Sequence, residues 1–210
     1  MKRGSILVIF LFAVATIYAQ ISGYGLDHTP QIDLPLLDNA TLIKKELSKR
    51  EIGRPPSFAE PCDVDANCHE KGQWKITSDT AIWHLIIHSK GAESLNFGFS
   101  AFYLPPSASI YLIGLNSSIR RGPFTVADNE SHDQFWSPII EDDKVLLELK
   151  VDSKEQKFVR LELFKVNHAF VKFGSGLLSG SCNLDVVCSA GEGWGRNDDY
   201  RDIMRSVVLY

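Results

Sequence analysis

Residues 145–151 read VLLELKV, and residues 159–163 read VRLEL. Aliphatic residues take every second position in both stretches, as in strands that bury one face and leave the other in water. The run Ala81–His88 carries apolar residues on both faces, which is typical of a central strand. Shorter runs between turn residues predict four more strands, at Leu95–Tyr103, Ile110–Leu115, Phe124–Ala127 and Gln134–Ile140. Many short strands predict a mainly β fold, an antiparallel, jelly-roll-like β-sandwich over residues 61–173.

A leader over residues 20–60 precedes this β-rich region. It contains apolar residues at helical spacing, namely Leu36, Ala40, Ile43 and Leu47. Asp38 or Asn39 could cap them, so the spacing predicts an amphipathic helix over residues 38–50. Pro55 and Pro56 end the helical stretch, because proline disfavours helix in the residue before it.

The first 19 residues have the pattern of a secretory signal peptide. Lys2 and Arg3 precede an unbroken apolar run over Ile6–Tyr18, and the small residue Ala19 follows it as the cleavage candidate. A transmembrane helix needs about 20 apolar residues, so we expect a secreted chain without a stable membrane span. An uncleaved amino-terminal anchor is the alternative.

Charge excludes one class of partner. Removing residues 1–19 takes away two of the 22 Lys and Arg residues and none of the 26 acidic ones, leaving a formal charge of −6. Nucleic-acid binding needs clustered Lys and Arg, and the sequence has no such cluster.

Four cysteines in an exported chain predict disulfides, because the compartment is oxidising. They form two pairs with equal spacing, Cys62 with Cys68 and Cys182 with Cys188. Four cysteines allow three connectivities, and spacing alone does not choose among them.

The sequence carries no complete catalytic or metal-binding signature, so we expect no catalytic residues, cofactor or metal in this chain. His69-Glu70 would begin a zinc protease motif, but Gln73 stands where the second His belongs. The stretch Asp63–Asn67 begins like a calcium loop, but Cys68 replaces the required glycine. Residues 98–101 begin like a nucleophile elbow, but Phe102 replaces its closing glycine.

His84 and His88 are four residues apart, which places them on the same face of a strand. A metal site would need a third ligand that the sequence does not nominate. Packing and cross-strand hydrogen bonding is therefore the preferred interpretation.

The carboxyl-terminal part resembles a known family. Residues 179–188 read SGSCNLDVVC, followed by GEG at 191–193, RDI at 201–203 and RSV at 205–207. This stretch resembles the start of the mature chain in the secreted lysyl endopeptidases, which are bacterial trypsin-like serine proteases. Four upstream strings resemble the β-rich pro-region of such proteases: GPFT at 122–125, DN at 128–129, QFWSP at 134–138 and VNH at 166–168.

The resemblance implies a zymogen. A double β-barrel protease domain would begin near Gly176, within a linker and domain start at 174–210, and its His, Asp and Ser would lie beyond Tyr210. Cys182 and Cys188 would then bond to later cysteines. The apolar run at the end of the sequence fits a chain cut from a longer one.

The pro-region would assist folding of its own downstream protease domain or keep it latent, and that domain would act on protein substrates. Lys172 is the candidate processing site for a lysine-specific enzyme. The alternative is a free-standing secreted binding module for carbohydrate or protein, whose aromatic residues would stack on the ligand: Trp74, Trp83, Trp136, Tyr103 and Tyr111.

Overall fold

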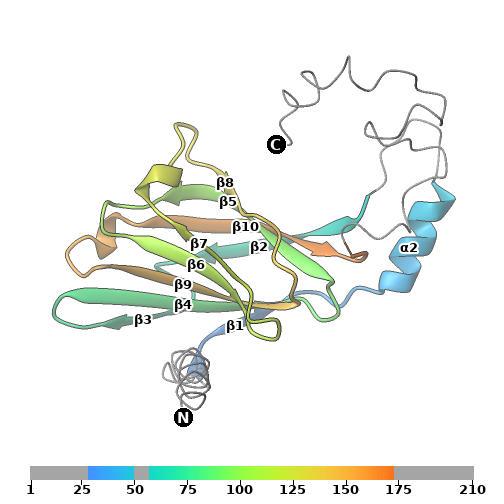
Figure 1. Ribbon diagram of the computed structural model, residues 1–210, viewed down its shortest axis with the longest axis horizontal. Helices are drawn as coiled ribbons and strands as arrows, with labels where there is room; N and C mark the ends of the chain where they lie inside the picture. Colours follow the sequence, from blue (N-terminus) through green and yellow to red (C-terminus); the bar gives the residue numbers. More distant parts are fainter. Residues whose placement is uncertain (1–27, 50–56, 173–210) are drawn as a thin grey trace, which may run out of the picture.

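A computed structural model describes residues 28–49 and 57–172. These residues form two β-sheets and one α-helix, so the predicted mainly β class is confirmed (Figure 1). The signal peptide with Ala19, the linker after residue 172, and Cys182 and Cys188 lie outside the described residues. Among the described residues, no helix combines the length and the apolar character needed to cross a bilayer.

The larger sheet has six strands in the order β1-β4-β9-β6-β7, with β3 also paired to β4. Its strands are β1 (Gln31–Asp33), β3 (Gln73–Ile76), β4 (Thr80–His88), β6 (Ser109–Gly114), β7 (Arg120–Phe124) and β9 (Lys144–Asp152). All pairs are antiparallel except β1 with β4. The sheet is therefore mixed, and the parallel strand comes from the predicted leader.

The smaller sheet has four antiparallel strands in the order β2-β10-β5-β8. They are β2 (Ala59–Asn67), β5 (Ser94–Tyr103), β8 (Phe135–Trp136) and β10 (Arg160–Ala169), and two short 3₁₀ helices, η2 (Val126–Asp128) and η3 (Gln156–Phe158), lie in connections. Both sheets contribute side chains to one apolar core. Each sheet therefore has one face against that core and one face turned away from it.

The alternation in the sequence correctly predicts which side chains enter this core. In β9, Val145, Leu147 and Leu149 have no exposed surface. Trp83 and Leu85 of β4 are equally enclosed, at 2% and 1% exposure. Burying such side chains contributes about 1.5–3 kcal/mol each, so the alternating strands provide the main stabilising term.

Several predicted strand bounds are wrong. The prediction at Phe124–Ala127 covers the end of β7 and the 3₁₀ helix η2, where Asp128 accepts a hydrogen bond from Thr125 N at 2.7 Å. Within the predicted strand Gln134–Ile140, the structure has only the two residues of β8 and an isolated bridge at Ile140. Strand β2 was not predicted, because its outward positions are proline and aspartate and its inward residues are small. As an edge strand paired only to β10, it tolerates a proline.

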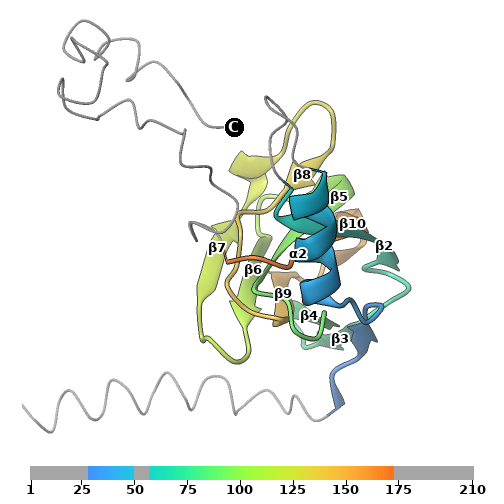
Figure 2. The same ribbon diagram turned by 90° about the vertical axis from the view of Figure 1, so that its right-hand side faces the viewer.

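The predicted helix is confirmed as α2 (Asn39–Ser48), with Asp38 as its N-cap. Its contact face differs from the predicted one. Leu42 and Ile43 pack on Phe170 and Val171, just beyond β10, whereas Leu47 is 41% exposed. Leu36 and Ala40 are exposed as well. Figures 1 and 2 place α2 at one end of the two sheets, so it caps that end rather than covering a sheet face.

Candidate functional site

The outward face of the four-stranded sheet holds the most unusual group of side chains in the described part of the chain. We call it the amide–indole face, and its members come from all four strands: Asp63, Asn67, Asn96, Gly98, Ser100, Trp136, Glu162, Phe164, Lys165 and Asn167. Strand pairing puts Trp136 opposite Gly98, Gly98 opposite Lys165, and Lys165 opposite Asp63. These residues therefore form one row across the sheet.

Trp136 lies flat on this row. A Cβ placed on Gly98 would meet three adjacent carbons of the six-membered indole ring at 2.6, 2.7 and 2.8 Å. A point can be that close to three adjacent ring carbons only when it lies over the face of the ring. One face of the indole therefore rests on the Gly98 backbone, and the side chain remains 45% exposed. The Phe164 ring contacts the indole in a T-shaped arrangement, with ring centroids 5.6 Å apart and planes at 74°.

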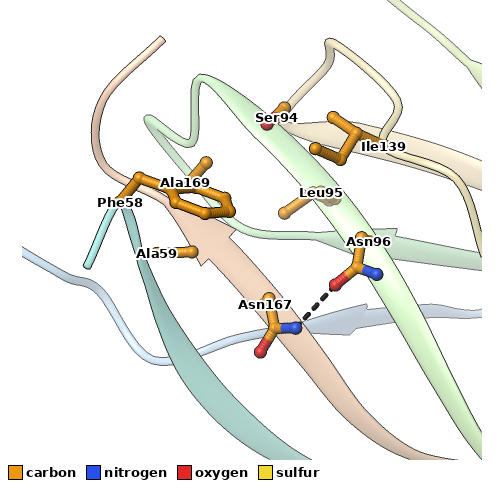
Figure 3. A pocket seen from close by; sticks show the side chains of 8 residues that line it. All are labelled: Phe58, Ala59, Ser94, Leu95, Asn96, Ile139, Asn167 and Ala169. Atoms are coloured by element: carbon orange, nitrogen blue, oxygen red, sulfur yellow. Dashed lines mark hydrogen bonds between the residues drawn. The ribbon is translucent and has the colours of Figure 1, made fainter. Parts of the chain in front are cut away.

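A pocket of about 220 Å³ opens beside the indole, one pleat further along the sheet. Its lining residues are Phe58, Ala59, Ser94, Leu95, Asn96, Ile139, Asn167 and Ala169 (Figure 3). Two amides form its polar part, because Asn167 Nδ2 donates to Asn96 Oδ1 at 2.6 Å and Asn96 Nδ2 donates to the Ser137 carbonyl at 3.1 Å. Apolar walls with few fixed polar groups are typical of small-molecule sites.

The single lysine of this face is paired with a carboxylate, and Glu162 adds a further negative charge. Lys165 Nζ lies 2.9 Å from Asp63 Oδ1, and Asn67 Nδ2 donates to Glu162 Oε1 at 3.3 Å. Ser100 Oγ donates to the Glu162 carbonyl at 3.3 Å. The face therefore presents amides, a hydroxyl, a paired cation and the Glu162 carboxylate around one indole.

A second polar group lies where α2 meets the sheets, with His168 and Ser89 buried and Asn39 partly exposed. His168 Nε2 donates to Asn39 Oδ1 at 2.8 Å, and Ser89 Oγ donates to His168 Nδ1 at 2.7 Å. Asn39 Oδ1 can only accept, so the neutral form of His168 carries its proton on Nε2. Asn39 Nδ2 donates to the Gly91 carbonyl at 2.8 Å. Burial lowers the pKa of His168, while the nearby Asp143 carboxylate opposes this shift.

This Ser–His–Asn arrangement is structural. Ser89 and His168 have no exposed surface, so no substrate reaches the hydroxyl. A serine triad also needs an acid to stabilise the protonated base, and Asn39 is neutral. The network instead ties the helix of the leader to β10 and to the turn after β4.

Cys62 and Cys68 are buried free thiols. They are six residues apart along and just beyond β2, about 20 Å at strand spacing, whereas bonded cysteines have Cα atoms within about 7 Å. A bond between these two is therefore incompatible with this fold. Burial raises the pKa of both thiols, that of Cys68 to about 11.

The other predicted residues lie apart from one another. His84 is 3.3 Å from Glu148 and His88 is 2.8 Å from Asp33, so the two histidines have separate carboxylate partners. Within residues 28–49 and 57–172, no three His, Cys, Asp or Glu side chains are grouped to hold a metal. The aromatic residues predicted to form one binding face are also dispersed. Trp83 is in the core, and Tyr103 and Tyr111 each carry a separate arginine.

No protein-family model matches this chain. The candidate site therefore depends on its geometry alone.

Lys172 is exposed and follows the end of β10 by three residues. A protease that recognises lysine could reach this side chain without unfolding a strand.

Two features of these sites could not be found from sequence patterns. Before residue 164 the buried residues have odd numbers, namely Val159, Leu161 and Leu163. A β-bulge between Leu163 and Lys165 shifts the alternation, so that the even-numbered residues point inward after it. His168 therefore turns inward, although the earlier alternation would place it outside. The contact between Trp136 and Gly98 depends on a strand pairing between distant residues, which no local signal marks.

Proposed function

We propose that the described β-rich region is the pro-domain of a secreted, lysyl endopeptidase-like serine protease precursor. The observation that carries this proposal is the position of the domain's end. Strand β10 finishes at Ala169, and the stretch that resembles the start of a mature protease begins at Ser179. A folded β-rich unit therefore precedes the segment that resembles a protease, with the exposed Lys172 between them.

The strand order supports a jelly-roll interpretation of this pro-domain. Strands β2, β10, β5 and β8 form one sheet, and β4, β9, β6 and β7 are four of the six strands in the other. Successive strands of this eight change sheet at every step except from β6 to β7. This is the order that two interleaved Greek keys produce in a jelly roll.

The Ser89–His168 contact is buried in the interior, so the proposed role of this domain is that of a helper to the protease. A double-barrel protease has strongly non-local strand pairing, so it folds slowly and its stability is largely kinetic. A preformed β domain on the same chain can lower that folding barrier and keep the protease inactive during export. The partner of the pro-domain is then its own downstream protease domain.

Processing at Lys172 tests this proposal. The complete reading frame is expressed, and the mature amino terminus is sequenced from the wild type, from Lys172→Ala and from the matched control Lys154→Ala. Lys154 is also exposed but lies in the turn after β9. We expect cleavage after Lys172, with loss of that product only in Lys172→Ala. A mature chain that starts far from residues 173–179, or a frame that encodes no protease, would refute the proposal.

Refolding separates the two helper roles. The denatured protease domain is refolded with and without the separate pro-domain, and activity on a lysyl peptide substrate is followed. An increased yield of active enzyme identifies a folding role, whereas inhibition of already folded enzyme identifies latency. If equimolar pro-domain neither increases the refolding yield nor inhibits the folded enzyme, both helper roles are contradicted.

A further inference from the structure

We infer that the amide–indole face binds a neutral oligosaccharide whose pyranose rings have flat C–H faces, as glucose-based chains do. This inference does not depend on the proposed function, because a pro-domain and a free-standing module could both carry such a site. It rests on the orientation of one indole, on the two amides of the adjacent pocket and on the pairing of the one lysine of the face with a carboxylate.

The indole has the orientation that sugar stacking requires. Its inner face rests on Gly98, so its other face points away from the sheet. The Phe164 ring packs against the indole with ring centroids 5.6 Å apart, which helps to hold the indole in place. A rigid, half-exposed aromatic ring offers apolar contact area at a small cost in conformational entropy. The face of a pyranose ring can lie on it while the sugar hydroxyls project sideways.

The pocket supplies hydrogen-bonding groups next to this platform. Among the described residues, no group donates to Asn167 Oδ1, while Asn167 Nδ2 is held by Asn96. A sugar hydroxyl can donate to that oxygen, which the Asn96 contact holds in place. Asn96 lies two residues from Gly98, about 7 Å along β5. The pocket and the indole are therefore close enough to contact neighbouring rings of one chain.

The composition of the face disfavours other ligands. Its lysine is neutralised by Asp63 at 2.9 Å, which removes the attraction that an anionic ligand would need. A stable protein interface buries about 800 Å² on each partner around an apolar core. The exposed large apolar side chains here are only Trp136 and, at the rim of the pocket, Phe58. At about 220 Å³ the pocket accommodates a ligand smaller than a typical drug-sized molecule.

The test is titration calorimetry of the full chain with cellohexaose and, separately, laminarihexaose, with mannitol as a polyol that has no ring to stack. Three variants accompany the wild type. Trp136→Ala removes the platform, and Gly98→Ala keeps the indole but pushes it off the sheet. Phe158→Ala removes another exposed aromatic, 54% exposed and on a different element, as the matched control.

We expect saturable binding of at least one hexasaccharide and none of mannitol. Trp136→Ala and Gly98→Ala should each weaken binding about tenfold or more, and Phe158→Ala should leave it unchanged. Circular dichroism confirms that each variant is folded, and Asn167→Ala provides a second test of the pocket if Trp136→Ala is unstable. Absence of binding to both sugars, or binding that Trp136→Ala and Gly98→Ala leave intact, would overturn the inference. Self-association lost in Trp136→Ala would assign the face to a second copy and also overturn it.

Discussion

Replacing Asn39 by alanine should lower the free energy of unfolding, because this side chain joins α2 to the β domain. Its Oδ1 accepts from His168 Nε2 at 2.8 Å, and its Nδ2 donates to the Gly91 carbonyl at 2.8 Å. His168 has no exposed surface, so its Nε2–H would be left without an acceptor. An unsatisfied buried donor costs about 1–3 kcal/mol. Alanine is the better helix former by up to about 0.7 kcal/mol, so the net loss is about 1–2 kcal/mol.

Urea denaturation followed by circular dichroism measures this loss. With a slope of about 1–3 kcal/mol per molar urea, the midpoint should fall by roughly 1 M. The matched control is Ser48→Ala, near the other end of the same helix, where the hydroxyl donates only to the Lys45 carbonyl at 2.7 Å in an exposed turn. The control should stay within about 0.5 kcal/mol of the wild type. Equal midpoints for Asn39→Ala and Ser48→Ala would show that the helix is not held through His168.

Three further predictions concern buried groups. Burial lowers the pKa of His168. Its contribution to stability is therefore complete above its unfolded pKa of about 6.5 and is lost as pH falls below that toward the folded pKa. Urea midpoints measured between pH 7.5 and 5 should fall more in the wild type than in His168→Gln. Burial raises the pKa of Cys68 to about 11, so its thiol is almost entirely protonated at pH 8. Iodoacetamide should therefore label it only after denaturation. Rapid labelling of the native protein, seen by mass spectrometry, would contradict its burial. Asp142 is 6% exposed and accepts hydrogen bonds from the backbone N–H groups of Asn116 at 2.9 Å, Ser117 at 2.6 Å and Lys144 at 2.8 Å. Asp142→Ala should therefore lower the free energy of unfolding by about 2 kcal/mol. Thermal melts should show a smaller loss for the neighbouring control Asp143→Ala.

Asp142 also gives a second, more acidic pH dependence. Burial alone would raise its pKa, but the hydrogen bonds from the Ser117, Lys144 and Asn116 backbone lower it overall. A lowered folded pKa stabilises the protein above the unfolded value, and this contribution is lost as pH falls through the folded one. The Asp142 contribution should therefore disappear near pH 4 and below, in a range separate from that of His168.

The core of this domain could be predicted because its strands alternate without interruption. In β9 and in the first half of β10, every second residue is aliphatic and every one of these is buried. The edge strands β2 and β7 escaped prediction because they bury little, and because Pro61 in one and Gly122-Pro123 in the other read as turns. Their strand conformation is imposed by pairing with a neighbour rather than by local preference.

The candidate site could not be predicted for a different reason. Glycine in a strand interior costs about 0.5–1 kcal/mol relative to alanine, and nothing in the sequence near Gly98 compensates for it. Trp136, 38 residues later, occupies the space that a Cβ would fill, yet it remains 45% exposed. A fully buried aromatic residue would stabilise the core more, and a polar residue would suit the surface better. Gly98 and Trp136 are therefore each unfavourable for stability, and they are in contact on the same sheet. Positions that are unfavourable for local structure concentrate at functional sites in natural proteins. Gly98→Ala therefore distinguishes a binding site from incidental packing. It should favour the strand conformation locally while weakening the binding of any ligand to the displaced indole.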